Sequence, residues 1–121
     1  MTKILCVEDS EDNLLALHKR LGMAGFDVKV ATNGEEGVDW AKTLLPDLIV
    51  MDLRLPGING WEATRRLKSQ PETKHIPIIV VTADTSDESR EKAFAAGCDA
   101  FEVKPVKFEK LAKTIQSLLD R

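Results

Sequence analysis

Five short apolar runs alternate along the chain with segments of helical periodicity. The runs span residues 4–7, 28–31, 48–51, 78–81 and 100–103. Residues 48–51 and 78–81 are apolar at every position, as in strands covered on both faces, whereas residues 28–31 alternate and predict an edge strand. The alternation predicts an α/β fold, a doubly wound five-stranded parallel sheet with helices on both faces.

Polar residues mark the starts of the predicted helices. Three pairs match the capping-box pattern, in which side chain and backbone satisfy each other: Asn33 and Glu36, Asn59 and Glu62, and Thr85 and Glu88. An amphipathic helix near the C-terminus is predicted by an apolar stripe made of Phe108, Leu111, Ile115 and Leu118. We expect this helix to pack on the sheet.

Length and composition fit one compact domain. The chain has 121 residues, 43% hydrophobic and 31% charged, so we expect a single module over residues 1–121. The net charge of -3 gives no general attraction for nucleic acid or an anionic membrane. Cys6 and Cys98 form no CxxC pair, and no apolar stretch could span a bilayer. These features predict a cytoplasmic protein.

Polar groups follow four of the five apolar runs. Glu8 and Asp9 come after the first run, Asp52 after the third, Thr82 after the fourth and Lys104 after the fifth. Carboxyl ends of parallel strands meet at one edge of a sheet, so these groups should converge there. Three carboxylates against one ammonium leave a surplus of negative charge that calls for a divalent cation, and oxygen ligands favour Mg²⁺ or Mn²⁺.

A hard cation beside a carboxylate, a hydroxyl and a lysine fits phosphoryl transfer. This chemistry depends mainly on positioning and on neutralising the phosphoryl oxygens. Asp52 is the candidate nucleophile that forms an aspartyl phosphate, with Thr82 and Lys104 binding phosphoryl oxygens.

The motifs resemble the receiver domains of bacterial two-component response regulators, and the similarity to single-domain chemotaxis regulators covers nearly the whole chain. The motifs are Val7-Glu8-Asp9, the run from Pro46 to Asp52, Pro56-Gly57-Ile58-Asn59-Gly60, Val81-Thr82-Ala83 and Lys104-Pro105. The resemblance implies the flavodoxin-like strand order 2-1-3-4-5, a receiver without an output domain in residues 1–121, and a cis peptide bond between Lys104 and Pro105.

The same resemblance implies the metal site and the phosphoryl donor. Asp52 would be the phosphoacceptor, and Glu8, Asp9, Asp52 and the backbone carbonyl of Arg54 would hold Mg²⁺. The donor would be a phosphohistidine on a histidine kinase or a histidine phosphotransfer protein. Glu8 stands where many relatives have aspartate, so we expect Asp9 to bind the metal directly and Glu8 partly through water.

A conformational switch is also implied. Thr82 would move toward the phosphoryl group as Phe101, three positions before Lys104, changes rotamer. The fourth helix, fifth strand and fifth helix would then present the surface read by a downstream protein, with no direct binding of nucleic acid or membrane. Arg54 and Asp84 are expected to pair across the pocket and to slow loss of the phosphoryl group.

Three alternatives remain open at this point. A receiver-like module could bind partners without phosphorylation, although the intact acidic pair, Asp52, Thr82 and Lys104 argue against this. A Mg²⁺-dependent phosphohydrolase would need a second carboxylate where Arg54 stands. Flavin binding is disfavoured because acidic residues after the first strand would repel a phosphate: Glu8, Asp9, Glu11 and Asp12. The sequence therefore predicts a self-phosphorylating signalling protein rather than a metabolic enzyme.

Overall fold

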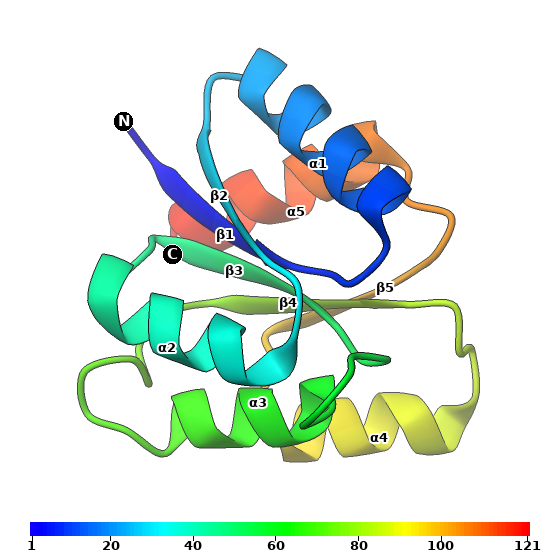
Figure 1. The fold of residues 1–121 in the computed structure, drawn as a ribbon. Helices are drawn as coiled ribbons and strands as arrows, with labels where there is room; N and C mark the ends of the chain where they lie inside the picture. The colour runs from blue at the N-terminus through cyan, green and yellow to red at the C-terminus, as the bar shows by residue number, and fades with distance from the viewer.

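Five strands and five helices alternate strictly along the chain in the computed structural model, which describes residues 1–121 (Figure 1). The strands are β1 (Lys3–Val7), β2 (Asp27–Ala31), β3 (Leu48–Asp52), β4 (Ile78–Thr82) and β5 (Ala100–Val103). The helices are α1 (Glu11–Met23), α2 (Gly34–Leu44), α3 (Gly60–Lys68), α4 (Asp87–Ala95) and α5 (Phe108–Leu119). Each predicted strand is confirmed to within one residue at either end.

The strands form one parallel sheet in the order β2-β1-β3-β4-β5. The central strand pair is in register from Ile4 opposite Leu48 to Val7 opposite Met51. The flavodoxin-like order is therefore confirmed. β2 lies at an edge, as its alternating pattern predicts, while every residue of β3 and β4 is buried.

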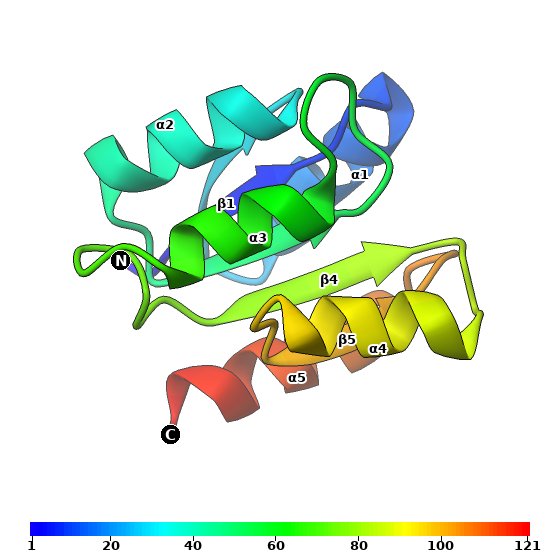
Figure 2. The same cartoon turned by 90° about the horizontal axis from the view of Figure 1, so that it is seen from below.

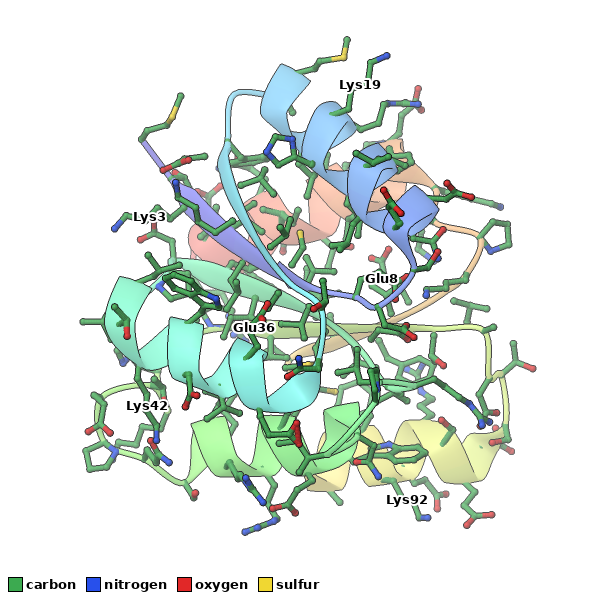
Figure 3. All side chains as sticks on the ribbon, in the orientation of Figure 1. Lys3, Glu8, Lys19, Glu36, Lys42 and Lys92 are labelled. Atoms are coloured by element: carbon green, nitrogen blue, oxygen red, sulfur yellow. The ribbon has the colours of Figure 1, made fainter.

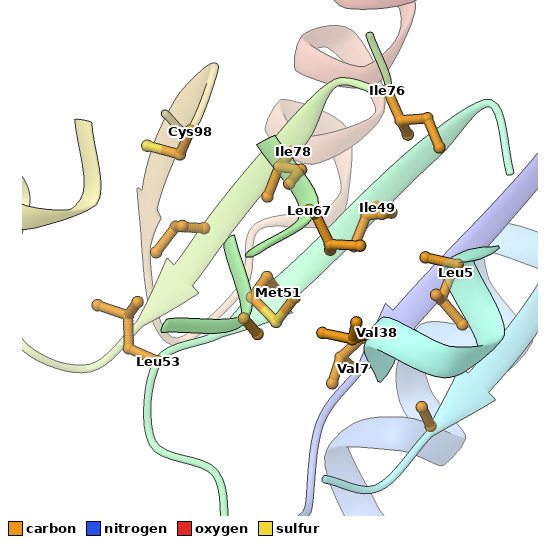
Figure 4. Close-up of a cluster of buried hydrophobic side chains, with 14 of the residues drawn as sticks. Leu5, Val7, Val38, Ile49, Met51, Leu53, Leu67, Ile76, Ile78 and Cys98 are labelled. Carbon is orange, nitrogen blue, oxygen red and sulfur yellow. The ribbon is translucent and has the colours of Figure 1, made fainter. Parts of the chain in front are cut away.

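Two hydrophobic cores lie on opposite faces of the sheet. Helices α1 and α5 cover one face, and α2, α3 and α4 cover the other (Figures 1 and 2). Successive strand residues point to alternate faces, so Leu5 and Met51 join the core under α2, α3 and α4 (Figure 4). Their neighbours Cys6 and Val50 join the core under α1 and α5. This double coverage explains the uninterrupted apolar runs.

Two of the three predicted capping boxes form only in part. Asn33 and Asn59 do cap α2 and α3, accepting hydrogen bonds from the backbone N–H groups of Glu36 and Glu62 at 2.8 and 2.9 Å. The reciprocal bonds are absent. The Glu36 carboxylate accepts from the Thr32 N–H, and the Glu62 carboxylate is held by arginines of its own helix.

The predicted cap at Thr85 is wrong. Helix α4 begins one residue later, because the hydroxyl of Ser86 accepts the Ser89 N–H at 3.1 Å. The Asp84 carboxylate accepts the Ser86 N–H at 2.9 Å and so fixes the turn that precedes the helix. Ser86 is an equally good cap, and this turn selects it.

The C-terminal helix confirms its predicted apolar stripe. Leu111, Ile115 and Leu118 are buried in the core beneath α5, and Phe108 packs against that core. Cys6 and Cys98 are both free and buried. No helix of the structure combines the length and hydrophobicity needed to cross a membrane.

Candidate functional site

Three carboxylates meet at the carboxyl edge of the sheet. One oxygen from each of Glu8, Asp9 and Asp52 lies within 4.8 Å of the others. Asp52 is the last residue of β3 and is 6% exposed, and Glu8, directly after β1, is 2% exposed. Glu8 stands where β1 ends, close to the first turn of α1 (Figure 3). Asp9 is exposed, so the cluster has one open side.

Lys104 bridges the two buried carboxylates. Its Nζ donates to Glu8 Oε1 at 2.6 Å and to Asp52 Oδ2 at 3.2 Å. The lysine follows β5 and precedes Pro105 through a cis peptide bond, as the resemblance implies. A residue 52 positions from Asp52 in sequence thus lies directly beside it.

Asn13 is a member of the site that the sequence analysis missed. Its Nδ2 donates to Glu8 Oε1 at 2.7 Å from the first turns of α1, and the Asp9 N–H donates to Glu8 Oε2 at 3.1 Å. With Lys104, three donors converge on one buried carboxylate. No local motif signals this role, because only the turn between β1 and α1 brings Asn13 back to Glu8.

The environment separates the acidities of the two buried acids. Burial, reinforced by hydrogen bonding with Glu8 and by its charge, raises the pKa of Asp52 to about 7. Burial also acts to raise the pKa of Glu8, but hydrogen bonding with Asp52, Lys104 and Asn13 outweighs it and leaves that pKa lowered. Glu8 is therefore the more acidic member of the pair, and the pKa of Asp52 is raised toward neutrality.

Thr82 ends β4 beside this cluster and is completely buried. The sheet register sets Asp52 opposite Val81, one residue before Thr82. The Thr82 hydroxyl accepts the Asp84 N–H at 3.1 Å, which ties it to the connection leading into α4. The structure thus brings Thr82 to the same edge as the carboxylates and links it to a loop.

Arg54 and Asp84 lie on two neighbouring connections at the rim. Their side chains approach to 3.8 Å between Arg54 Nη2 and Asp84 Oδ2, so the predicted pair is present. The Arg54 guanidinium is well exposed, and its backbone N–H donates weakly to Asp52 Oδ1 at 3.4 Å. The pKa of Asp84 lies below its ordinary value. Hydrogen bonds with Ser86 are the main cause, and the positive charge of Arg54 is a smaller one.

Phe101 lies farther from the carboxylates, in the edge strand β5. It is half-buried and packs against the core under α4, while the guanidinium of Arg90 lies 5.7 Å from its ring centroid. Phe101 therefore belongs to the strand that leads directly to Lys104, three residues later.

Gly60 permits the close turn that follows Asp52. Its N–H donates to the Leu53 carbonyl at 3.0 Å. A Cβ at this position would collide with the Asp52 carbonyl oxygen and with the Leu53 backbone. The glycine in the Asn59-Gly60 pair therefore allows α3 to begin directly against the strand that carries Asp52.

The donor set fits a hard divalent cation. All three clustered side chains offer carboxylate oxygens, and no histidine or cysteine belongs to the group. Two of the carboxylates are buried with only one ammonium between them, so a cation would offset their repulsion. Asp9, exposed at the open side, is the carboxylate best placed for an ion entering from solvent.

Known proteins are similar to nearly all of this chain in sequence and fold. The family model of the response regulator receiver domain matches residues 4–116. The polar-differentiation response regulator DivK of Brucella anthropi is 36% identical over 96% of this chain and 94% of its own.

Solved structures show the same similarity. A response regulator from Chloroflexus aurantiacus superposes with a TM-score of 0.95 at 31% identity, covering 99% of this chain and 98% of its own. The receiver domain of a Pseudomonas aeruginosa sensor histidine kinase, solved with magnesium in its active site cleft, gives a TM-score of 0.93 at 32% identity with the same coverage. The chain thus belongs to the response regulator receiver domains, the phosphoacceptor modules of two-component signalling.

Proposed function

We propose that Asp52 is the phosphoacceptor of this receiver and that Lys104 and Thr82 assist it. The observation that carries the proposal is the position of Asp52, buried at the end of β3 and bridged by Lys104 to a second buried carboxylate. Burial raises the pKa of Asp52 to about 7, so its carboxylate is more basic, and therefore a better nucleophile, than that of an ordinary aspartate.

The transfer step is a displacement at phosphorus. A carboxylate oxygen of Asp52 attacks the phosphoryl group of a phosphohistidine on a histidine kinase or phosphotransfer protein. The new O–P bond forms as the P–N bond breaks, and the electron pair stays on the imidazole nitrogen. Lys104 is placed to follow the negative charge from Asp52 onto the phosphoryl oxygens, with the Thr82 hydroxyl as a further donor.

Removal of the phosphoryl group from Asp52 requires only water. Water attacks phosphorus, the bond between phosphorus and the Asp52 oxygen breaks, and inorganic phosphate leaves. In this proposal the chain promotes phosphorylation and dephosphorylation of its own aspartate and turns over no other substrate, which separates it from a metabolic enzyme.

Mg²⁺, or Mn²⁺ in its place, completes the proposed site. Glu8, Asp9, Asp52 and the backbone carbonyl of Arg54 would hold the ion, with Asp9 as the direct ligand and Glu8 acting partly through water. When bound, the ion neutralises charge on the phosphoryl oxygens. The magnesium in the cleft of the P. aeruginosa receiver supports this assignment.

Phosphorylation is proposed to act on a protein partner through α4, β5 and α5. Thr82 is hydrogen-bonded to the loop before α4, and Phe101 belongs to β5, the edge strand that Lys104 follows, so both are candidates to transmit a change at Asp52. Residues 1–121 act as a single module in this proposal, with output by binding rather than by direct contact with nucleic acid or membrane. The free cysteines are compatible with a reducing cytoplasm.

Intact mass after incubation with acetyl phosphate and Mg²⁺ tests the proposal. We expect one phosphoryl adduct on the wild type, none on Asp52→Asn, and an unchanged adduct on Asp12→Asn, which alters an exposed carboxylate of α1. Absence of the adduct in the wild type would favour a module that binds partners unphosphorylated. Continuous release of phosphate from added phosphoesters would favour a phosphohydrolase.

A further inference from the structure

The loop that joins β3 to α3, residues 53–59, forms part of the solvent-facing side of the site. It includes Arg54, whose backbone carbonyl belongs to the proposed metal site. Residues 53–56 of this loop also line a hollow of about 520 Å³ together with Asp9 and Trp61. A cation that approaches Asp9 from solvent through this hollow therefore passes the loop.

The middle of this loop is held by a single hydrogen bond. At its ends, the Gly60 N–H donates to the Leu53 carbonyl at 3.0 Å. Between them, residues 55–58 have no polar side chain, and the one hydrogen bond that they make is donated by the Ile58 N–H. The side chains of Leu55 and Ile58 pack against the core, but apolar packing has no direction. The hydrogen bond of Ile58 therefore fixes the backbone at this point.

The acceptor of this hydrogen bond is Glu35, which lies in the first turn of α2. Its Oε1 accepts the Ile58 N–H at 2.5 Å, across 23 positions of the sequence. Figure 2 shows the loop after β3 beside the N-terminal end of α2. The neighbouring carboxylate, Glu36, instead accepts the N–H of Thr32, directly before its own helix. Glu35 is thus the member of this acidic pair that reaches another part of the fold.

Two glycines allow the loop and the helix to approach this closely. Gly57 has a φ of 76°, and a Cβ at this position would collide with the Glu35 carboxylate. A Cβ at Gly34 would collide with the carbonyl of Ile58. Ile58 is therefore held through its N–H by Glu35, while its carbonyl lies against the start of α2. A carboxylate that only favoured the helix N-terminus through its charge would require neither close contact.

We propose that Glu35 is a positioning residue for cation binding, because it holds the loop between β3 and α3 and so keeps Arg54 beside Asp52. Glu35 acts through the loop and contacts neither the cation nor the phosphoryl group. Without its carboxylate, residues 55–58 keep their packing but lose their one hydrogen bond. Binding of the cation must then also order the loop, which lowers the affinity. This inference rests on the metal site of the proposed function.

Two measurements on Glu35→Ala test the role of this residue. Amide hydrogen exchange of Ile58, followed by NMR without Mg²⁺, should become about tenfold faster. Calorimetric titration should show Mg²⁺ binding about fivefold more weakly, whereas the midpoint of urea unfolding should stay close to that of the wild type.

Two control variants separate the hydrogen bond from the charge. Glu35→Gln removes the negative charge at the start of α2 but keeps an acceptor oxygen, so it should retain most of the Ile58 protection and of the Mg²⁺ affinity. Asp39→Ala, which removes an exposed carboxylate later in the same helix, should match the wild type in both measurements.

Three results would overturn the positioning role of Glu35: equal exchange of the Ile58 amide in wild type and Glu35→Ala, an unchanged Mg²⁺ affinity, or a Glu35→Gln chain that behaves like Glu35→Ala. The titration of the wild type keeps this proposal apart from the proposed function. A wild type that binds no Mg²⁺ would reject the metal site and any role of Glu35 in it. A wild type that binds Mg²⁺ as tightly as Glu35→Ala does would reject the role of Glu35 alone.

Discussion

Lys104 lies closer to Glu8 than to the proposed phosphoacceptor, with Nζ 2.6 Å from Glu8 Oε1 and 3.2 Å from Asp52 Oδ2. The pKa of Lys104 is raised because its hydrogen bonds and ion pairs with these carboxylates outweigh the effect of burial. The Lys104 ammonium thus offsets part of the negative charge of Glu8 and Asp52 that a metal ion would otherwise neutralise. It can move from Glu8 toward a phosphoryl group on Asp52.

Replacing this ammonium should destabilise the chain and tighten Mg²⁺ binding. Lys104→Met leaves two buried carboxylates without compensation, so we expect the free energy of unfolding to fall by about 2 kcal/mol at mildly alkaline pH without Mg²⁺. Mg²⁺ should restore most of this loss and bind more tightly than in the wild type, because no ammonium competes for Glu8. Urea unfolding and calorimetric titration measure both effects. Lys110→Met, on the surface of α5, is the control, and equal behaviour of the two variants would refute the bridging role.

The raised pKa of Asp52 predicts an unusual dependence of stability on pH. The folded chain holds a proton on Asp52 up to about pH 7, whereas the unfolded chain releases it near its ordinary pKa of about 3.9. Between these values the folded state binds more protons, so this group makes the free energy of unfolding fall as pH rises. Glu8, whose pKa is lowered, acts in the opposite direction but only at more acidic pH.

Asp52→Asn should remove this slope. Without Mg²⁺, we expect the variant to match the wild type near pH 4 and to exceed it above pH 7 by an amount on the order of 2 kcal/mol, smaller than the full shift because water screens the rim of the site. Urea unfolding across this pH range provides the measurement, with Asp12→Asn as the control. Parallel curves for wild type and Asp52→Asn would show that Asp52 ionises at its ordinary pKa.

The sequence predicted the sheet well because each strand carries its own signal. Leu48 to Met51 and Ile78 to Val81 are apolar throughout, and both faces of those strands are buried. The convergence of Glu8, Asp52 and Lys104 followed from the rule that parallel strands end at one edge. The positions of these three residues depend only on the path of the backbone. The periodicity of the sequence and its resemblance to receiver domains both indicate that path.

The details that the sequence did not reveal are side-chain choices among near-equal partners. Thr85 and Ser86 are both acceptable caps, and only the hydrogen bond from the Ser86 N–H to Asp84 selects Ser86. Asn13 is exposed, like its neighbours Glu11 and Asp12, yet its side-chain amide also donates to Glu8. Its contact with Glu8 depends on the rotation of α1 relative to β1, which no local motif encodes.

Asn13 should support cation binding through Glu8. It donates to the same Glu8 oxygen as Lys104 and would keep that carboxylate in place when Lys104 moves away. We expect Asn13→Ala to weaken Mg²⁺ binding about tenfold with little change in the fold. Calorimetric titration gives the affinity, and Asp12→Ala on the same turn of α1 controls for loss of a nearby polar group. A Mg²⁺ affinity equal to that of the wild type would show that Asn13 is dispensable.

The Arg54–Asp84 pair should slow loss of the phosphoryl group. The two side chains approach across the rim to 3.8 Å and would obstruct water on its way to Asp52. Arg54→Ala and Asp84→Ala should each speed dephosphorylation about two- to fivefold, a modest effect because the pair is exposed. Decay of the phosphoryl adduct, followed by intact mass after donor removal, gives the rates. Unchanged or slower decay in both variants would reject the obstruction.

Gly60 should be the glycine whose replacement harms the site most directly. In Gly60→Ala the new Cβ meets the Asp52 carbonyl and the Leu53 backbone, neither of which can move without displacing the end of β3. We expect a loss of at least about 2 kcal/mol in the free energy of unfolding, with slower phosphorylation of the molecules that remain folded. Gly22→Ala is the matched control, since its Cβ would meet no atom within 4 Å in α1 and should stabilise the chain by about 0.5–1 kcal/mol. Urea unfolding and the rate of adduct formation with acetyl phosphate separate the two variants, and a Gly60→Ala chain as stable and as reactive as the wild type would mean that the start of α3 can shift without moving Asp52.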